Sequence, residues 1–153
     1  MSELKRILLV EDSENDIELT LAALEEAHLA NEVDVVRDGQ EALDYLHRQG
    51  AWASRGDGYP AVVLLDLKLP KVNGLEVLAH VKGEADLKSI PVVMLTSSRE
   101  ESDLARSYGL GVNAYVVKPV DFHDFSLALR ELGLFWAVVN QPPPGSIRKD
   151  GKR

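Results

Sequence analysis

Five side chains capable of acid, metal or phosphate chemistry stand directly after four short apolar runs of the chain. They are Glu11, Asp12, Asp66, Thr96 and Lys118. The runs are rich in Val and Leu and lack polar alternation, a pattern that predicts strands buried on both faces. Open α/β sheets place their chemistry at the carboxyl ends of such strands. Each of these residues alone fits a loop or a helix cap, but five of them at four strand ends favour one shared site.

The residue types of this set suit phosphoryl transfer. Three carboxylates that converge on one edge repel one another, so some should have raised pKa values unless a cation sits among them. Carboxylate and carbonyl oxygens, without sulfur or clustered histidine, suit a hard divalent ion, and Mg²⁺ is the expected one. Asp66 would be the nucleophile that forms an aspartyl phosphate. Lys118 would supply positive charge, and Thr96 a hydroxyl donor, to the added oxygens.

Strands that alternate with helices must hold these residues in place. Apolar runs predict strands at 5–10, 33–36, 61–65, 90–95 and 114–117. Helical spacing and cap residues predict helices from Ser13 to about Ala30, from Asp38-Gly39 to Gly50, after Asn73-Gly74, at 104–108, and from Asp121 to about Val139. Residues 51–60 are expected to form an exposed loop. This order predicts an α/β fold with a five-stranded parallel sheet, doubly wound with helices on both faces.

Composition limits the function classes. The 153 residues include 17 basic and 25 acidic side chains, a net charge of −8, which argues against a nucleic-acid-binding protein. The apolar run near the amino terminus is too short for a signal peptide or membrane span, and cysteine is absent, which fits a cytoplasmic protein. We expect one domain, residues 1–139, and a disordered tail, residues 140–153, too short to be a DNA-binding domain.

From Lys5 to Val139 the chain resembles the receiver domain of two-component response regulators. The residues that carry the resemblance are Glu11-Asp12, Asp66, Pro70, Gly74, Thr96, Tyr115 and Lys118-Pro119. The spacing also fits, since Asp66 lies 30 residues before Thr96, and Thr96 lies 22 residues before Lys118. The resemblance implies the flavodoxin-like (βα)5 receiver fold. One departure is Glu11, because the family often has aspartate at that position.

The resemblance also implies a role for each site residue. Asp66 would accept a phosphoryl group from a sensor histidine kinase, and Lys118 would pair with the phosphate. Thr96 and Tyr115 would move together on phosphorylation. Such a protein is not an enzyme beyond catalysing its own phosphorylation and dephosphorylation. The implied ligands of Mg²⁺ are Asp66, the backbone carbonyl of Lys68, and the acidic pair Glu11 and Asp12.

A narrower resemblance is to single-domain regulators partnered with phytochrome-type histidine kinases. It rests on the loop 51–60, on Leu134-Phe135-Trp136 near the end of the last helix, and on the short tail. That helix is apolar nearly all round, although the last helix of this fold has a solvent face. We expect phosphorylation to switch the surface formed by the fourth helix, fifth strand and fifth helix for partner binding or dimerisation, and we expect the last helix to form a homodimer interface. The expected interface residues are Phe122, Phe125, Leu127, Leu134, Phe135 and Trp136.

Two other protein classes share parts of this pattern. A phosphatase resembling the haloacid dehalogenase group needs a second aspartate two residues after the nucleophile, where this chain has Lys68. A flavodoxin-like cofactor binder needs a hydroxyl- and glycine-rich turn after the first strand, where this chain has the acidic run 11–16. The histidines are scattered in the sequence and are expected to be surface or packing residues without a metal pattern: His28, His47, His80 and His123.

Overall fold

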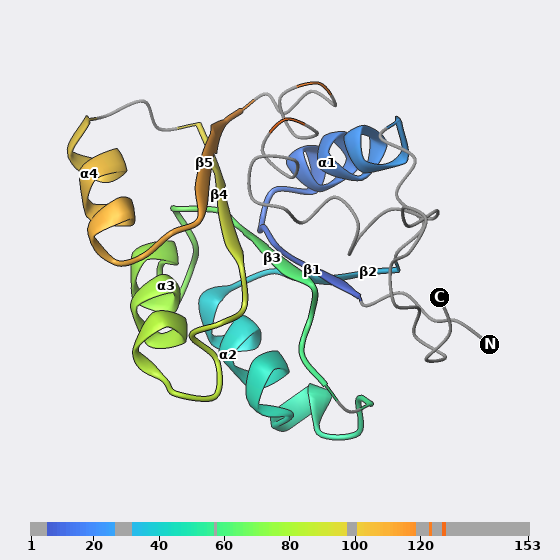
Figure 1. Cartoon of the computed structure of the whole chain (residues 1–153). Helices are drawn as coiled ribbons and strands as arrows, with labels where there is room; N and C mark the ends of the chain where they lie inside the picture. Colours follow the sequence, from blue (N-terminus) through green and yellow to red (C-terminus); the bar gives the residue numbers. More distant parts are fainter. Residues whose placement is uncertain are drawn as a thin grey trace, which may run out of the picture.

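The protein forms a parallel sheet with helices on both faces, as predicted (Figure 1). The computed structural model describes residues 6–26, 32–56, 58–97 and 101–118, together with residues 123 and 127. Within these residues the strands are β1 (Ile7–Val10), β2 (Val33–Val36), β3 (Val62–Leu65), β4 (Val92–Thr96) and β5 (Ala114–Val117). The helices are α1 (Glu14–Glu26), α2 (Gly39–His47), α3 (Gly74–Gly83) and α4 (Glu101–Gly109), with a short 3-10 helix at Gly50–Trp52. Of the expected last helix, 121–139, residues 123 and 127 are described, and both are helical; the rest of that range and the expected tail, 140–153, lie outside the described residues.

The strand order is β2-β1-β3-β4-β5, with all pairs parallel. Alternate residues of β1 face opposite sides of this sheet. Leu8 and Val10 join a core cluster with residues of α2 and α3, whereas Ile7 and Leu9 join a second cluster with Ile17 of α1. All four β1 side chains are at most 1% exposed. The continuous apolar runs of the sequence are therefore explained by helices that cover both faces.

Helix caps fix where the helices begin beside the strand ends. Ser13 Oγ accepts a bond of 3.3 Å from the backbone N–H of Asp16, as the predicted cap of α1. The Asp38 side chain caps α2, and Asn73 forms a reciprocal capping box at the start of α3. Each capped start lies shortly after a strand in the chain. The helices consequently begin at the edge of the sheet where the strands end.

Several predicted boundaries differ from the structure by one to three residues, and those of β4 and α2 have clear causes. The fourth strand begins at Val92 rather than residue 90, since Pro91 has no N–H to donate to a strand ladder, and it extends to include Thr96. The second helix ends at His47 rather than at Gly50. Arg48 takes a left-handed conformation with φ of 55°, and its N–H bonds the carbonyls of Asp44 and Tyr45.

The segment 51–60 is only partly the exposed loop that was predicted. Arg55 Nε donates to the backbone carbonyl of Tyr45 at 2.7 Å, and its guanidinium lies 4.4 Å from the centre of the Tyr45 ring. Trp52 Nε1 donates to Glu41 at 3.1 Å. These contacts hold the segment against α2 through a cation–π contact and side-chain hydrogen bonds.

A network of hydrogen bonds and ion pairs connects the edge strand β2 to Tyr45. Tyr45 is 1% exposed and donates its hydroxyl to Asp34 at 2.6 Å. Arg6 donates two bonds to the Asp34 carboxylate, at 2.6 and 2.7 Å. Burial alone would raise the pKa of Asp34, but the hydrogen bonds from Arg6 and Tyr45 bring it below its ordinary value. Asp34 is thus held in its charged form.

We expect the substitution Asp34→Asn to destabilise the protein in a pH-dependent way. Because the folded-state pKa is lowered, the charged carboxylate stabilises the fold above the unfolded-state pKa of about 3.9. This stabilisation is lost as the pH falls through the folded-state pKa. The free energy of unfolding should drop by about 2 kcal/mol at neutral pH and by less as the pH falls below about 4.

Urea unfolding across this pH range measures the difference. The exposed Asp86→Asn substitution is the matched control and should change little. An equal loss for Asp34→Asn at every pH would contradict the assignment.

Candidate functional site

Three carboxylates and one ammonium group meet at the carboxyl edge of the sheet. Lys118, directly after β5, donates to Asp66 at 3.0 Å and to Asp16 at 2.9 Å. It also donates to Glu11, directly after β1. The Lys118 side chain is 10% exposed, and that of Glu11 is 2% exposed. The strand ends therefore bring Glu11, Asp66 and Lys118 into direct contact, as the sequence predicted.

The strand pairing places these residues without long loops. Asp66 N–H donates to the carbonyl of Val10 at 3.0 Å, which fixes it beside Glu11. Lys118 N–H donates to the carbonyl of Thr96 at 2.8 Å. In a sheet of this strand order, β1 and β3 lie at the point where the order reverses, where ligands bind in open α/β sheets.

Burial and the hydrogen bonds made by Lys118 shift the pKa values of Glu11 and Lys118 in opposite directions. Burial raises the pKa of Glu11, and the bond from Lys118 opposes this rise only in part. Burial alone would lower the pKa of Lys118, but its bonds to Glu11 and Asp16 raise it. Raised pKa values were expected unless a cation sat among the carboxylates. The Lys118 ammonium lies among them, and burial still raises the pKa of Glu11.

The carboxylates also offer oxygens to a metal ion. One oxygen each of Glu11, Asp12 and Asp66 lies within 4.8 Å of the others. Glu11 and Asp66 are buried, whereas Asp12 is exposed. An all-oxygen set of this kind fits Mg²⁺ or Mn²⁺ better than a soft metal.

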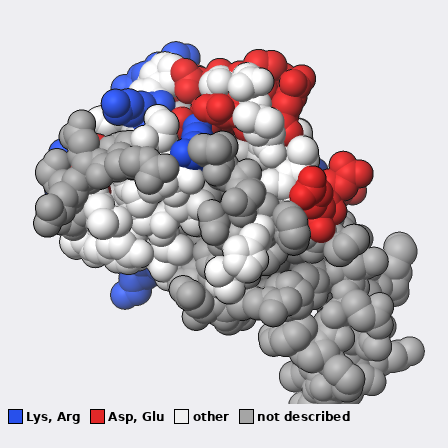
Figure 2. Space-filling view, turned by 90° about the horizontal axis from the view of Figure 1, so that it is seen from above, with Lys and Arg blue, Asp and Glu red and all other residues white. Residues whose placement is uncertain are grey.

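A groove adjoins this cluster at Asp12. Its volume is about 480 Å³. Figure 2, viewed from above relative to Figure 1, shows acidic side chains gathered over part of this face, with basic side chains nearby. The groove is lined by Asp12, Leu67, Lys68, Leu69, Pro70, Asn73, Leu75 and Asp103.

The loop that follows β3 contacts Asp66 closely. Lys68 is exposed, and its N–H donates to Asp66 Oδ1 at 3.3 Å. Gly74 packs so closely that an added Cβ would lie 2.1 Å from the carbonyl oxygen of Asp66 and 2.7 Å from Leu67 Cα. Its N–H donates to the Leu67 carbonyl at 2.8 Å. Position 74 therefore has no room for a side chain.

Thr96 and Tyr115 lie on neighbouring strands. Thr96 is 1% exposed at the end of β4, and Tyr115 is half-buried on β5 against the core cluster of α2 and α3. In the β4–β5 register, Thr96 is opposite Val117 and Tyr115 is opposite Met94. Thr96 therefore sits at the site edge, two residue positions further along the ladder than Tyr115.

Sequence reasoning missed Asp16 as a member of the site. Asp16 lies in the first turn of α1, where a carboxylate also interacts favourably with the helix dipole. Its position three residues after the Ser13 cap placed it at the same edge as Glu11, and this was the available signal.

Of the predicted interface residues, Leu127 lies within the described part of the chain and is 44% exposed. The other predicted interface residues lie outside the described residues: Phe122, Phe125, Leu134, Phe135 and Trp136.

Comparison with known proteins identifies the arrangement. A family model described as "Response regulator receiver domain" matches residues 7–130. The chain belongs to this family. Receiver domains generally hold Mg²⁺ or Mn²⁺ at an acidic pocket, and the receiver described here has such a pocket at Glu11, Asp12 and Asp66.

Several relatives cover most of this receiver. Response regulator Rcp1 of Synechocystis sp. is 42% identical over 132 residues, covering 86% of this chain and 88% of Rcp1. The probable methanogenesis regulatory protein FilR2 of Methanothrix harundinacea is 42% identical over 139 residues, covering 90% of this chain and 86% of FilR2.

Solved structures agree with this relationship. Bacteriophytochrome response regulator RtBRR is 67% identical with a TM-score of 0.82, covering 94% of this chain and 86% of RtBRR. The Mn²⁺-bound form of Rcp1 is 40% identical with a TM-score of 0.72, covering 91% of this chain and 99% of that one. Among the described residues, no helix of this receiver is long and apolar enough to cross a membrane.

We expect Gly74→Ala to disturb both the fold and the metal pocket. The new Cβ would meet backbone atoms that cannot rotate away, so Leu67 and Asp66 must shift. The free energy of unfolding should fall by about 3 kcal/mol, and the affinity for Mg²⁺ should fall with it.

Gly83 offers a matched control in the same helix. An added Cβ there meets nothing within 4 Å, so Gly83→Ala should leave stability unchanged or raise it by up to about 1 kcal/mol. Urea unfolding and Mg²⁺ titration compare the two variants. Similar unfolding midpoints for both would show that the close approach at Gly74 is unimportant.

Proposed function

We propose that this receiver accepts a phosphoryl group on Asp66 from a phytochrome-type sensor histidine kinase in a Mg²⁺-dependent reaction. The observation that carries the proposal is the bond of 3.0 Å from Lys118 to Asp66, made within a buried cluster of acidic side chains. The kinase class is supported by the relatives named as phytochrome or bacteriophytochrome response regulators. The absence of cysteine fits a reducing compartment, and we propose that this exchange occurs in the cytoplasm.

In this reaction, a carboxylate oxygen of Asp66 attacks the phosphorus of a phosphohistidine on the kinase. A P–O bond forms, the P–N bond breaks, and the kinase imidazole leaves with the electron pair of that bond. Mg²⁺ would be held by the side chains of Glu11, Asp12 and Asp66 and by the backbone carbonyl of Lys68, and when bound it neutralises charge on the transferred group. Lys118 then pairs with phosphate oxygens instead of with the free Asp66 carboxylate.

The added charge is large enough to change the conformation. At an effective dielectric constant near 20, a pair of unit charges 4 Å apart interacts by about 4 kcal/mol before desolvation. Allosteric couplings are typically about 1–3 kcal/mol. We propose that Thr96 moves toward the phosphate and that Tyr115 turns inward into the space it leaves, which changes the surface of α4 and β5.

We expect label to transfer from an autophosphorylated phytochrome-type kinase to wild type but not to Asp66→Asn. The substitution removes the nucleophilic oxygen while keeping the shape of the side chain. Asp86→Asn, an exposed carboxylate, is the control and should accept label as wild type does.

Chelation of divalent ions by EDTA should abolish the transfer. An unrelated histidine kinase, incubated for the same time, tests the proposed kinase class. Label on Asp66→Asn would overturn the choice of nucleophile, and equal rates from both kinases would overturn only the phytochrome pairing.

We further propose that the exposed side chains of α4, together with Leu127, belong to the surface that passes the signal on, with a second copy of the chain as its first partner. Leu104 and Tyr108 of α4 are 38% and 53% exposed, and Leu127 is 44% exposed. Exposed apolar side chains of this size are available for a protein contact.

Sedimentation at tens of micromolar, with and without a phosphoryl mimic, tests the dimer. Wild type should sediment as a dimer, and Leu127→Glu should shift it toward monomer because the new charge would be buried unpaired. Leu19→Glu on α1, where Leu19 is 49% exposed, is the control and should leave the dimer intact. A wild-type monomer under both conditions would refute the proposed dimer.

A further inference from the structure

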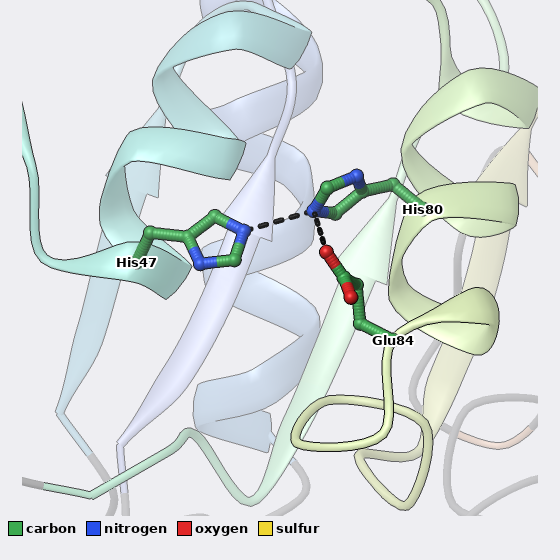
Figure 3. Close-up of side chains that lie close together, drawn as sticks. All are labelled: His47, His80 and Glu84. Carbon is green, nitrogen blue, oxygen red and sulfur yellow. Dashed lines mark hydrogen bonds and ion pairs between the residues drawn. The ribbon is translucent and has the colours of Figure 1, made fainter.

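Two of the four histidines meet in space, contrary to the expectation that they form no metal pattern. His47 lies in the last turn of α2 and His80 in α3, and their Nε2 atoms are 2.8 Å apart. Glu84, the C-cap residue directly after α3, places Oε1 3.7 Å from His80 Nε2. Figure 3 shows the three side chains pointing toward one another across the gap between the two helices.

We propose that His47, His80 and Glu84 form a binding site for a Zn²⁺ ion. One ligand atom from each residue lies within 4.8 Å of the other two. Two imidazoles and one carboxylate are a set that Zn²⁺ binds, with a water molecule in the fourth position of a tetrahedron. Nitrogen ligands also favour Zn²⁺ over Mg²⁺, which prefers oxygen.

The geometry requires only small side-chain movements to receive the ion. With ligands about 2.05 Å from Zn²⁺, a tetrahedral arrangement separates neighbouring ligand atoms by about 3.3 Å. The separations from His80 Nε2, 2.8 Å to His47 Nε2 and 3.7 Å to Glu84 Oε1, lie on either side of this value, and ligand atoms of His47 and Glu84 lie within 4.8 Å of each other. His47 is exposed and the side chains of His80 and Glu84 are 33% and 52% exposed, so rotation of the rings is not blocked by the core.

This site is separate from the acidic pocket. Helices α2 and α3 begin beside the strand ends that hold Asp66, and they run back along the sheet (Figure 1). His47 and Glu84 stand at the other ends of these helices, on the opposite edge. A bound ion would connect the carboxyl-terminal ends of α2 and α3, which already pack together.

Competition with a chromophoric zinc chelator, using untagged full-length protein in millimolar Mg²⁺, tests the site. The Mg²⁺ occupies the acidic pocket but does not compete for imidazole ligands. Wild type should bind one Zn²⁺ per chain with micromolar or tighter affinity. His47→Gln, His80→Gln and Glu84→Gln should each weaken this binding at least tenfold, since even the loss of outer-shell partners weakens metal sites by about 10–100-fold.

Two controls make the result specific. His123→Gln, at an exposed histidine elsewhere, and the double variant Asp12→Asn/Asp66→Asn should both bind Zn²⁺ as wild type does. Co²⁺ bound to wild type should show the intense visible absorption of a tetrahedral site, and His47→Gln/His80→Gln should abolish it. Thermal unfolding in EDTA establishes that the variants fold.

Three outcomes would overturn the proposal. The first is a wild type that binds no Zn²⁺ at micromolar concentration. The second is unchanged binding by the folded His47→Gln/His80→Gln protein. The third is loss of binding in Asp12→Asn/Asp66→Asn. In the first case the contact is only a hydrogen-bonded histidine pair, and in the other two the ion is held elsewhere.

Discussion

The contact of the Lys118 ammonium with the carboxylates of Glu11, Asp16 and Asp66 is the constraint on which the rest of the site depends. Burying several negative charges at one sheet edge without a cation would be strongly unfavourable. The lysine reduces this cost, and it joins residues that follow β1, β3 and β5 with the first turn of α1. A buried ion pair of this kind is weak evidence for net stability, because desolvation offsets most of the attraction. Its value lies in a positive charge that is already in place beside the oxygen of Asp66.

Much of the site could be predicted from the sequence because the fold converts sequence position into spatial position. In a parallel sheet with helical crossovers, every strand ends at the same edge, so residues that follow apolar runs must converge. The convergence of Glu11, Asp66 and Lys118 could be predicted from their positions after the strands alone. The cap at Ser13 was also readable, because a hydroxyl before an acidic first turn is a local signal.

The features that were missed depend on how helices pack, which the sequence does not state. Asp16 contacts Lys118 because the packing of α1 on the sheet brings the first turn of this helix beside Lys118. His80 and Glu84 are four residues apart and detectable as a pair, but His47 is 33 residues earlier, on another helix. The end of α2 was placed too late, since the left-handed turn at Arg48 uses a residue that is not glycine. Arg55 was assigned to solvent because its partner, the ring of Tyr45, is identified only by the tertiary structure.

The carboxylate of Asp34 has a consequence for the behaviour of the protein at high concentration. Strand β2 is an edge strand, and among the described strands it pairs with β1 alone. An exposed edge strand can pair with a strand from another molecule and start aggregation. A strand added beside β2 would have to cover a charged carboxylate and the half-exposed Arg6 bound to it. The charged pair therefore disfavours the pairing of another strand at this edge.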